Sequence, residues 1–309
     1  MPLSPALMLE PQSGRPTGPA PGRARLRRGT RLLGLALLLL TAALVWQSSH
    51  RVGTGPAAGT SLRGGASTST AGGTAPAILR VGTFNIHGGK GLDNRRDLDR
   101  IASEIRTLDL VGLNEVEGPF LIERKTQVEE LARRLDMPWL FAPSERRWWH
   151  YDFGNGVVTR LPVERWERIP LPRSFGKGFR NLVVLEAKFS GKPLRVVVTH
   201  IDRRDDRERK AQLRYVADYF LALPEPAILM GDLNTTAGDA ELCRLLESPG
   251  VVDVLGRHHQ ENPPSHIDWI LTRGLVVREA GMGEVGASDH PVVWAALELA
   301  PQAVETARY

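Results

Sequence analysis

Cysteine is almost absent from this sequence, which has a single one, Cys243, in 309 residues. One thiol cannot form an internal disulfide or a cysteine-rich zinc site. The fold must therefore be held together by an apolar core, and the 42% of hydrophobic residues suits a globular protein of ordinary composition. Cys243 lies among apolar residues at helical spacing and is expected to pack in that core.

Acidic residues are scarce at the N-terminus. Residues 1–77 hold eight of the 40 Lys and Arg residues and one of the 35 Asp and Glu residues, whereas residues 78–309 hold 32 basic and 34 acidic residues. The net charge of +5 therefore belongs to the N-terminal part. The rest of the chain lacks the charge asymmetry of a protein that coats nucleic acid, so a nucleic-acid partner is neither required nor excluded.

Long hydrophobic runs are also missing, with one exception at residues 32–46, the uncharged run LLGLALLLLTAALVW. This run follows an arginine-rich stretch and predicts a membrane anchor or signal segment over residues 32–47. An uncleaved anchor is favoured because no small-x-small cleavage site closely follows, although the run is shorter than the roughly 20 residues that span a bilayer. The arginines predict that residues 1–31 form a basic cytoplasmic tail and that the chain beyond the segment is extracytoplasmic, or secreted after cleavage.

Residues 48–77 are rich in Gly, Ala, Ser and Thr and are expected to form a flexible linker. Residues 78–299 alternate apolar runs rich in Val, Ile and Leu with segments of helical periodicity, which predicts one mixed α/β domain before a tail of residues 300–309. Strands are predicted over 78–86, 109–116, 154–160, 181–189, 193–201, 227–233 and 266–272. Helices are predicted over 98–108, 126–135, 207–223 and 239–247.

Several of these strands are bounded by an acid, an amide or an imidazole, where functional sites are usually assembled. These residues are Asn85, His87, Glu115, Asn155, His200, Asp232, Asn234, Asp268, Asp289 and His290. Each one alone is equally typical of a turn or a helix cap. Together they are rich in oxygen and contain no thiolate, which suits Mg²⁺ or Mn²⁺ better than structural zinc.

Seven short motifs run in order along residues 81–298. They read TFNIH, LNEV, GNGVVTR, VVTHID, GDLNTT, HIDWIL and SDHPVV. The series resembles that of endonuclease/exonuclease/phosphatase domains, the deoxyribonuclease I-like metal-dependent phosphoesterases. The resemblance implies a four-layer α/β sandwich, in which helices flank two packed β-sheets, and hydrolysis of a phosphate ester by in-line attack of an activated water.

The resemblance also implies a role for each motif residue. The implied metal ligands, for Mg²⁺ with Mn²⁺ as a possible substitute, are Asn85, Glu115 and Asp289. The implied catalytic residues are His200, Asp232, Asn234, Asp268 and His290: Asp232 activates the water, Asn234 binds the phosphate, both histidines meet the developing charge, and Asp268 orients His290. The implied substrate contacts are Asn155 and Arg180, although Arg180 can equally well only flank the sheet. His87 stands where some relatives have an acid, which leaves the number of metals open.

Three functions stay open for this domain, which is expected to be monomeric. The first is a membrane-anchored phosphoesterase that hydrolyses a phosphodiester or phosphomonoester of unresolved class, a lipid headgroup among them, and the second is an extracytoplasmic nuclease that acts on DNA or RNA. The third is a catalytically silent binding domain, which is disfavoured because every expected catalytic position holds a competent residue. The aromatic and basic residues in 144–156 fit nucleotide bases and lipid headgroups equally well.

Overall fold

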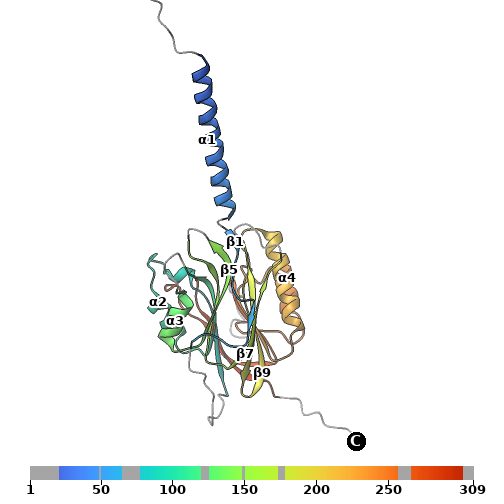
Figure 1. Cartoon of the computed structure of the whole chain (residues 1–309). Helices are drawn as coiled ribbons and strands as arrows, with labels where there is room; N and C mark the ends of the chain where they lie inside the picture. Colours follow the sequence, from blue (N-terminus) through green and yellow to red (C-terminus); the bar gives the residue numbers. More distant parts are fainter. Residues whose placement is uncertain are drawn as a thin grey trace, which may run out of the picture. The chain divides into compact units, whose positions relative to one another are not determined.

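The computed structural model describes residues 21–48, 50–64, 77–119, 125–147, 150–172, 178–256 and 266–301. It divides the chain into two compact units, Met1–Gln47 and Ser48–Tyr309. The first unit contains most of helix α1 (Pro21–Ser48), whose leucines are exposed (Figure 1). Within the described ranges, no helix combines the length and the apolar character that a membrane crossing requires. The transmembrane helix predicted over residues 32–47 is therefore not supported.

The second unit contains two β-sheets. The first sheet consists of β1 (His50–Val52), β5 (Trp139–Arg147), β6 (Phe153–Thr159), β4 (Leu110–Glu117), β3 (Leu79–Asn85), β14 (Val293–Leu299) and β13 (Leu275–Met282), in this spatial order. The second sheet consists of β11 (Val252–Asp253), β12 (Asp268–Arg273), β10 (Ala227–Asp232), β9 (Lys192–His200), β8 (Asn181–Phe189), β7 (Val163–Pro170) and β2 (Ala58–Gly59). The helices are α2 (Leu98–Ile105), α3 (Gln127–Leu135), α4 (Asp206–Ala222), α5 (Ala240–Leu246) and the 3₁₀ turn η1 (His87–Gly89).

Three layers of buried apolar side chains hold these elements together. Leu110 of β4 and Val198 of β9 belong to the cluster between the two sheets. Val111, the next residue of β4, packs with Ile101 of α2, because successive side chains of a strand point to opposite faces of the sheet. Phe220 of α4 belongs to the third cluster, on the outer face of the second sheet. The layers, with α2 and α3 on one side and α4 on the other in Figure 1, confirm the four-layer α/β sandwich.

Each α-helix of the second unit begins at a polar residue that caps it. The side chains of Asp97, Thr126, Asp205 and Asp239 accept hydrogen bonds from backbone N–H groups in the first turns of α2, α3, α4 and α5. Such a cap contributes about 1 kcal/mol, because it satisfies an N–H group that the helix itself leaves unpaired. Hydrogen bonds from Asp97 to Gly89 and from Gln127 to Gly88 bring the N-termini of α2 and α3 close to the end of β3, which carries predicted site residues.

Residues 50–64, expected to belong to a flexible linker, instead pack on the sandwich. Strand β1 pairs with β5 and β2 pairs with β7, and a bridge joins Arg63 to Trp139. The buried guanidinium of Arg168 donates to the carbonyl oxygens of Gly53 (2.9 Å) and Gly55 (3.2 Å). The glycines that suggested flexibility permit this close approach, since a Cβ at Gly53 would collide with the backbone of β5. Residues 65–76 of the expected linker lie outside the described residues.

Candidate active site

The predicted site residues meet where the two sheets present their strand ends. In the second sheet, Asp232 at the end of β10 lies beside His200 of β9 and opposite Asp268 of β12. In the first sheet, Asn85 ends β3 beside Asn114 of β4. The Asn85 side chain bridges the sheets, since its Nδ2 donates to Oδ2 of Asp232 at 3.0 Å. The two packed sheets thus bring motifs from both halves of the chain into one site.

Asp232 is at the centre of this site and is 1% exposed. Its Oδ1 accepts the backbone N–H of Asn234 (2.8 Å), while its own N–H donates to Oδ1 of Asn114 (2.8 Å). Burial and the charge of Asp268 raise the pKa of Asp232 to about 7. A carboxylate held in this way is a suitable general base near neutral pH.

Two histidines flank Asp232 in opposite charge states. Oδ2 of Asp232 lies 3.5 Å from Nε2 of His200 and 3.9 Å from Nε2 of His290. Burial opposes the charged form of His290, but the hydrogen bond from its Nδ1 to Asp268 (2.7 Å) and the charge of that carboxylate raise its pKa to about 9. Burial and the charge of Arg180 lower the pKa of His200 well below its ordinary value. Near pH 7, therefore, His290 offers an imidazolium and His200 a neutral ring.

Backbone strain is found at three of the predicted site residues, and also at Asn94, Asp136 and Ser190 outside the site. His87, Glu115 and Asn234 have backbone φ angles of 46°, 55° and 47°, which residues other than glycine rarely adopt. Glu115 lies at an irregularity in the pairing of β4 with β6, which turns its side chain out of the regular alternation. Each such residue costs about 1–3 kcal/mol and persists only where the surrounding structure enforces it. The strain is typical of a functional site.

The ends of β3 and β4 offer ligands for a hard cation. Glu115 follows the Asn85–Asn114 pair of the two strands, and the hydroxyl of Ser288 joins the backbone oxygen of Asn85 (2.7 Å) to Oδ1 of Asp289 (3.2 Å). Two carboxylates and one amide oxygen are the ligand types that Mg²⁺ and Mn²⁺ prefer. The ligand types of the predicted set are therefore suitable, and its role in holding a cation stays a prediction.

A second group of side chains, Asp232, Asp268 and His290, offers one ligand atom each within 4.8 Å of one another. Nδ1 of His290 is already engaged by Asp268. This group is therefore better suited to proton transfer than to holding a hard cation. His87, whose role the motifs leave open, lies beside the first ligand set, with its Nδ1 3.5 Å from Oδ1 of Asp289.

A buried network of amides supports the site and was not predicted. Nδ2 of Asn114 donates to the carbonyl oxygen of Thr199 (3.0 Å) and to Oδ1 of Asn155 (2.9 Å). Asn155 in turn donates to both oxygens of Asn181 (3.0 and 3.1 Å). These bonds engage both polar atoms of Asn155, so its contacts are those of a support between the sheets. The available signal was an amide inside an otherwise apolar strand, as in the letters LNEV.

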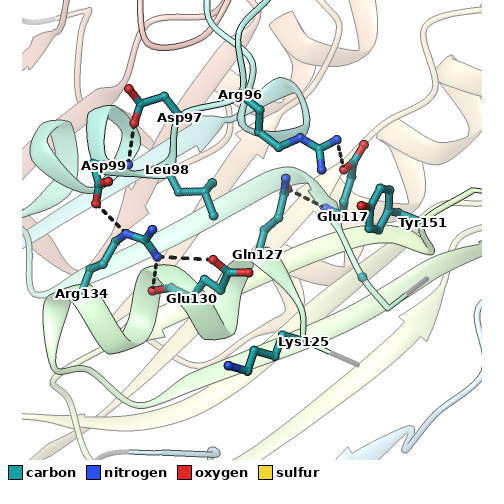
Figure 2. Close-up of a pocket in the computed structure, with 11 residues that line it drawn as sticks. Arg96, Asp97, Leu98, Asp99, Glu117, Lys125, Gln127, Glu130, Arg134 and Tyr151 are labelled. Atoms are coloured by element: carbon teal, nitrogen blue, oxygen red, sulfur yellow. Dashed lines mark hydrogen bonds and ion pairs between the residues drawn. The ribbon is translucent and has the colours of Figure 1, made fainter. Parts of the chain in front are cut away.

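A charged pocket of about 350 Å³ adjoins the site at the start of α2 and α3 (Figure 2). Nε2 of the buried Gln127 donates to the carbonyl oxygen of Gly88 (2.7 Å), and its Oε1 accepts the N–H of Glu117 (3.0 Å). Glu117 also pairs with Arg96 at 2.5 Å. Gln127 therefore ties the η1 turn, which carries His87, to the end of β4. Sequence reasoning did not assign this positioning role.

Arg180 and the aromatic and basic stretch 144–156 were also predicted to contact the substrate or the sheet. Arg180 lies at the edge of the site with its guanidinium 5.6 Å from the centre of the Phe153 ring, and that ring lies 6.2 Å from His200. In the aromatic and basic stretch 144–156, Trp148 and Trp149 lie outside the described residues. Their expected contact with a substrate therefore stays a prediction.

Residues 82–290 match the sequence model of the Endonuclease/Exonuclease/phosphatase family. No curated protein matches the chain. Among solved structures, the chain is similar to an endonuclease/exonuclease/phosphatase from Beutenbergia cavernae, with 24% identity, a TM-score of 0.59, and coverage of 73% of this chain and 72% of the other.

Two further similar structures carry different names. One is D. rerio TDP2 complexed with a single-strand DNA product, with 22% identity, a TM-score of 0.55, and coverage of 72% of this chain and all of the other. The other is a mannosyl-6-phosphatase from Bacteroides thetaiotaomicron, with 17% identity, a TM-score of 0.55, and coverage of 71% and 99%. At these identities the similarity establishes the fold and leaves the substrate undetermined.

Proposed function

The chain belongs to the endonuclease/exonuclease/phosphatase family, and from this premise we propose that its domain is a divalent-metal-dependent phosphoesterase. The observation that carries the proposal is the position of Asp232, which is buried and lies within 4 Å of Asn85, His200 and His290. A carboxylate with a pKa of about 7, next to one neutral and one charged imidazole, suits activation of a water for attack on phosphorus.

Each residue has a distinct task in the proposed reaction. Asp232 orients the water and accepts its proton, and the imidazolium of His290, held by Asp268, stabilises negative charge on the phosphoryl oxygens. Neutral His200 donates a hydrogen bond to the same group. Asn85, Glu115 and Asp289 would hold Mg²⁺ or Mn²⁺, which when bound supplies Lewis-acid stabilisation of the developing charge.

Turnover by the full-length chain tests this proposal. We expect hydrolysis of at least one member of a panel of plasmid DNA, RNA, phospholipid vesicles and inositol phosphates, in the presence of Mg²⁺ or Mn²⁺ and not of EDTA. Asp232→Asn should lower kcat by about 10²–10⁴-fold, the usual contribution of a general base. Glu279→Gln, which changes an exposed acid of β13, is the matched control and should have full activity.

If none of these substrates is hydrolysed although Mg²⁺ binds, the silent binding domain becomes the better reading. The names of the similar structures, a protein complexed with DNA and a sugar phosphatase, differ too much to select a substrate. A nuclease of this near-neutral domain should show a shallow salt dependence on duplex DNA, since it neutralises few phosphates. Absence of cleavage at every salt concentration would remove the nuclease alternative.

We also propose that residues 32–47 direct the domain out of the cytoplasm and toward a membrane. The support is the basic stretch before this segment and the exposed leucines of α1. Protease digestion of intact cells should then degrade the domain from outside. Full protection of the domain until the cells are lysed would contradict the proposal.

A further inference from the structure

Most of the exposed apolar side chains of the second unit lie in one region beside the site. Among the described residues of this unit, five large hydrophobic side chains are exposed, and three of them are Leu92 (66%), Met282 (39%) and Val285 (48%). The other two, Val52 and Tyr215, lie apart in β1 and α4. Single exposed apolar residues are normal on any protein surface, whereas a group of them indicates an interaction surface.

Two neighbouring loops, residues 90–96 and 283–287, carry Leu92 and Val285. The loops are joined through the backbone, since the N–H of Leu92 donates to the carbonyl oxygen of Gly286 (3.2 Å). The first loop directly follows the η1 turn, and the second leads within two residues to Asp289. The exposed side chains are therefore fixed close to the predicted cation ligands.

The first loop holds Leu92 at the surface. A backbone bridge joins Lys90 to Arg96, so the chain reverses between them with Leu92 in the turn. Asp93, the next residue, accepts hydrogen bonds from both terminal nitrogens of the Arg100 guanidinium in α2 (3.1 Å each). A leucine on a turn that is fixed in this way cannot move into the core. Its apolar surface thus stays available to a partner.

The charges around these apolar side chains nearly cancel. The ion pairs between described residues include Arg96 and Arg100 of this region but neither Lys90 nor Arg95. Glu284, an exposed acid of the second loop, offsets one of these two positive charges. The apolar side chains must therefore supply most of the free energy of any binding here, and the charges contribute little.

A lipid bilayer fits this surface better than a folded protein does. Three apolar side chains are far short of the roughly 800 Å² that each partner of a stable protein interface buries. At a bilayer, by contrast, a few apolar side chains are sufficient when the same chain has a second membrane contact. Residues 32–47, with their exposed leucines, offer such a contact.

We infer that Leu92 and Val285 enter the surface of a lipid bilayer and hold the site against it. The apolar side chains lie between the lipid headgroups, and Lys90 and Arg95 lie at the level of the lipid phosphates. This inference rests on the proposed phosphoesterase function and narrows its substrate to a phosphate ester of a lipid. It does not require a helix that crosses the membrane.

Quenching of a fluorophore on vesicles tests the contact without turnover. In the full-length chain, Cys243→Ser removes the native thiol and keeps a hydroxyl donor in its place. Leu92→Cys or Val285→Cys then carries a bimane label. Nitroxide groups on the acyl chains of phosphatidylcholine vesicles should quench both labels, whereas a label on Tyr215→Cys, exposed in α4, is the matched control and should keep its emission.

Quenching at both loops supports the inference whether or not the chain hydrolyses any ester. Absence of quenching at both loops overturns it and leaves the phosphoesterase proposal standing. A second copy of the chain is the alternative occupant of this surface. In that case the emission of the label at Leu92 should change with protein concentration in the absence of vesicles, and the nitroxide lipids should have no effect, which would also overturn the inference.

Turnover on two kinds of substrate separates docking from catalysis. The double variant Leu92→Ser, Val285→Ser should hydrolyse phospholipid in vesicles about tenfold more slowly than the wild type, because apolar burial at the interface is lost. Its turnover of the soluble ester bis-p-nitrophenyl phosphate should be unchanged, and Tyr215→Ser should behave like the wild type on both substrates. An equal loss on both substrates would contradict the inference. Hydrolysis of the soluble ester without that of any phospholipid would overturn the choice of a lipid substrate.

Discussion

The two sheets contribute two different kinds of surface to one site. The first sheet and the chain next to it bring the predicted cation ligands, and Asp289 among them has a side chain that is 46% exposed. The second sheet brings His200, Asp232 and Asp268, all at most 2% exposed. The protein itself sets the charge states of the buried groups, whereas Asp289 and the half-buried Glu115 are accessible to an exchangeable cation, and the third predicted ligand, Asn85, is buried.

The difference in burial between the two groups of site residues suggests how one fold can act on many phosphate esters. In the proposed reaction the buried groups carry out the proton transfer, which is the same for every ester, and hydrogen bonds between strands fix their positions. Under the proposed function, selection of the substrate is left to exposed groups around the buried ones. Changes in these exposed groups can therefore alter the preferred ester without disturbing proton transfer.

Substitution of a predicted cation ligand should have the largest effect and tests whether the ligands and the buried groups act separately. Glu115→Gln should raise the Mg²⁺ concentration needed for half-maximal activity by about 100-fold, because a neutral amide replaces the anionic ligand that Mg²⁺ requires. Activity should return at high Mg²⁺. The measurement is a Mg²⁺ titration of turnover for both proteins. If variant and wild type need the same Mg²⁺ concentration for half-maximal activity, Glu115 is not a ligand of the cation.

Removing the partner of His290 tests the buried surface. The folded pKa of about 9 keeps the imidazolium until the pH rises through 9, and Asp268→Asn should move this loss toward the ordinary value of about 6.5. At pH 8 the variant should therefore be about 30-fold less active than the wild type, with a smaller deficit at pH 6. Profiles of kcat against pH at saturating Mg²⁺ provide the measurement.

Additional Mg²⁺ should not restore the Asp268→Asn variant, whereas it restores Glu115→Gln. Rescue of both variants by the metal would remove the distinction between the two surfaces. An unchanged alkaline limb in Asp268→Asn would show that His290 does not depend on Asp268 for its charge.

The sequence was sufficient to predict the strands that are buried on both faces. The runs in β3, β4, β8, β9 and β10 are rich in Val, Ile and Leu, and the structure places strands there within a few residues of the predicted bounds. Among the motif residues, contacts join Asn85, His200, Asp232, Asp268 and His290, and the roles that the resemblance implied for them stay predictions. Strands β5, β7, β13 and β14 were not predicted. Charged residues interrupt β7 and β13 and their outer faces are exposed, whereas β14 is an apolar run that was missed.

Two parts of the molecule could not be predicted because they depend on contacts between distant residues. The Gly-rich segment 50–64 looks flexible, and only the position of Arg168 beside it shows that its carbonyl oxygens have a donor. Gln127 carries no local signal of function, and the only signal for Asn114 is an amide within an otherwise apolar strand. Their importance lies in partners 85 and 39 residues away in the sequence.

The smallest predicted effect concerns Ser288, which touches both surfaces. Its hydroxyl donates to the backbone oxygen of Asn85 (2.7 Å), and its oxygen accepts the N–H of His290 at the longer distance of 3.4 Å. Ser288→Ala should lower the free energy of unfolding by about 1 kcal/mol through the lost buried hydrogen bond. Chemical denaturation measures this loss.

Because the shorter of the two contacts is to Asn85, Ser288→Ala should affect the cation ligands more than His290. The Mg²⁺ concentration needed for half-maximal activity should rise several-fold. The alkaline limb of the pH profile should stay near pH 9. Ser288→Thr keeps the hydroxyl and serves as the control for its hydrogen bonds. A shifted alkaline limb with unchanged Mg²⁺ dependence would mean that Ser288 belongs to the buried surface, and the boundary between the two surfaces would then lie between Asn85 and Ser288.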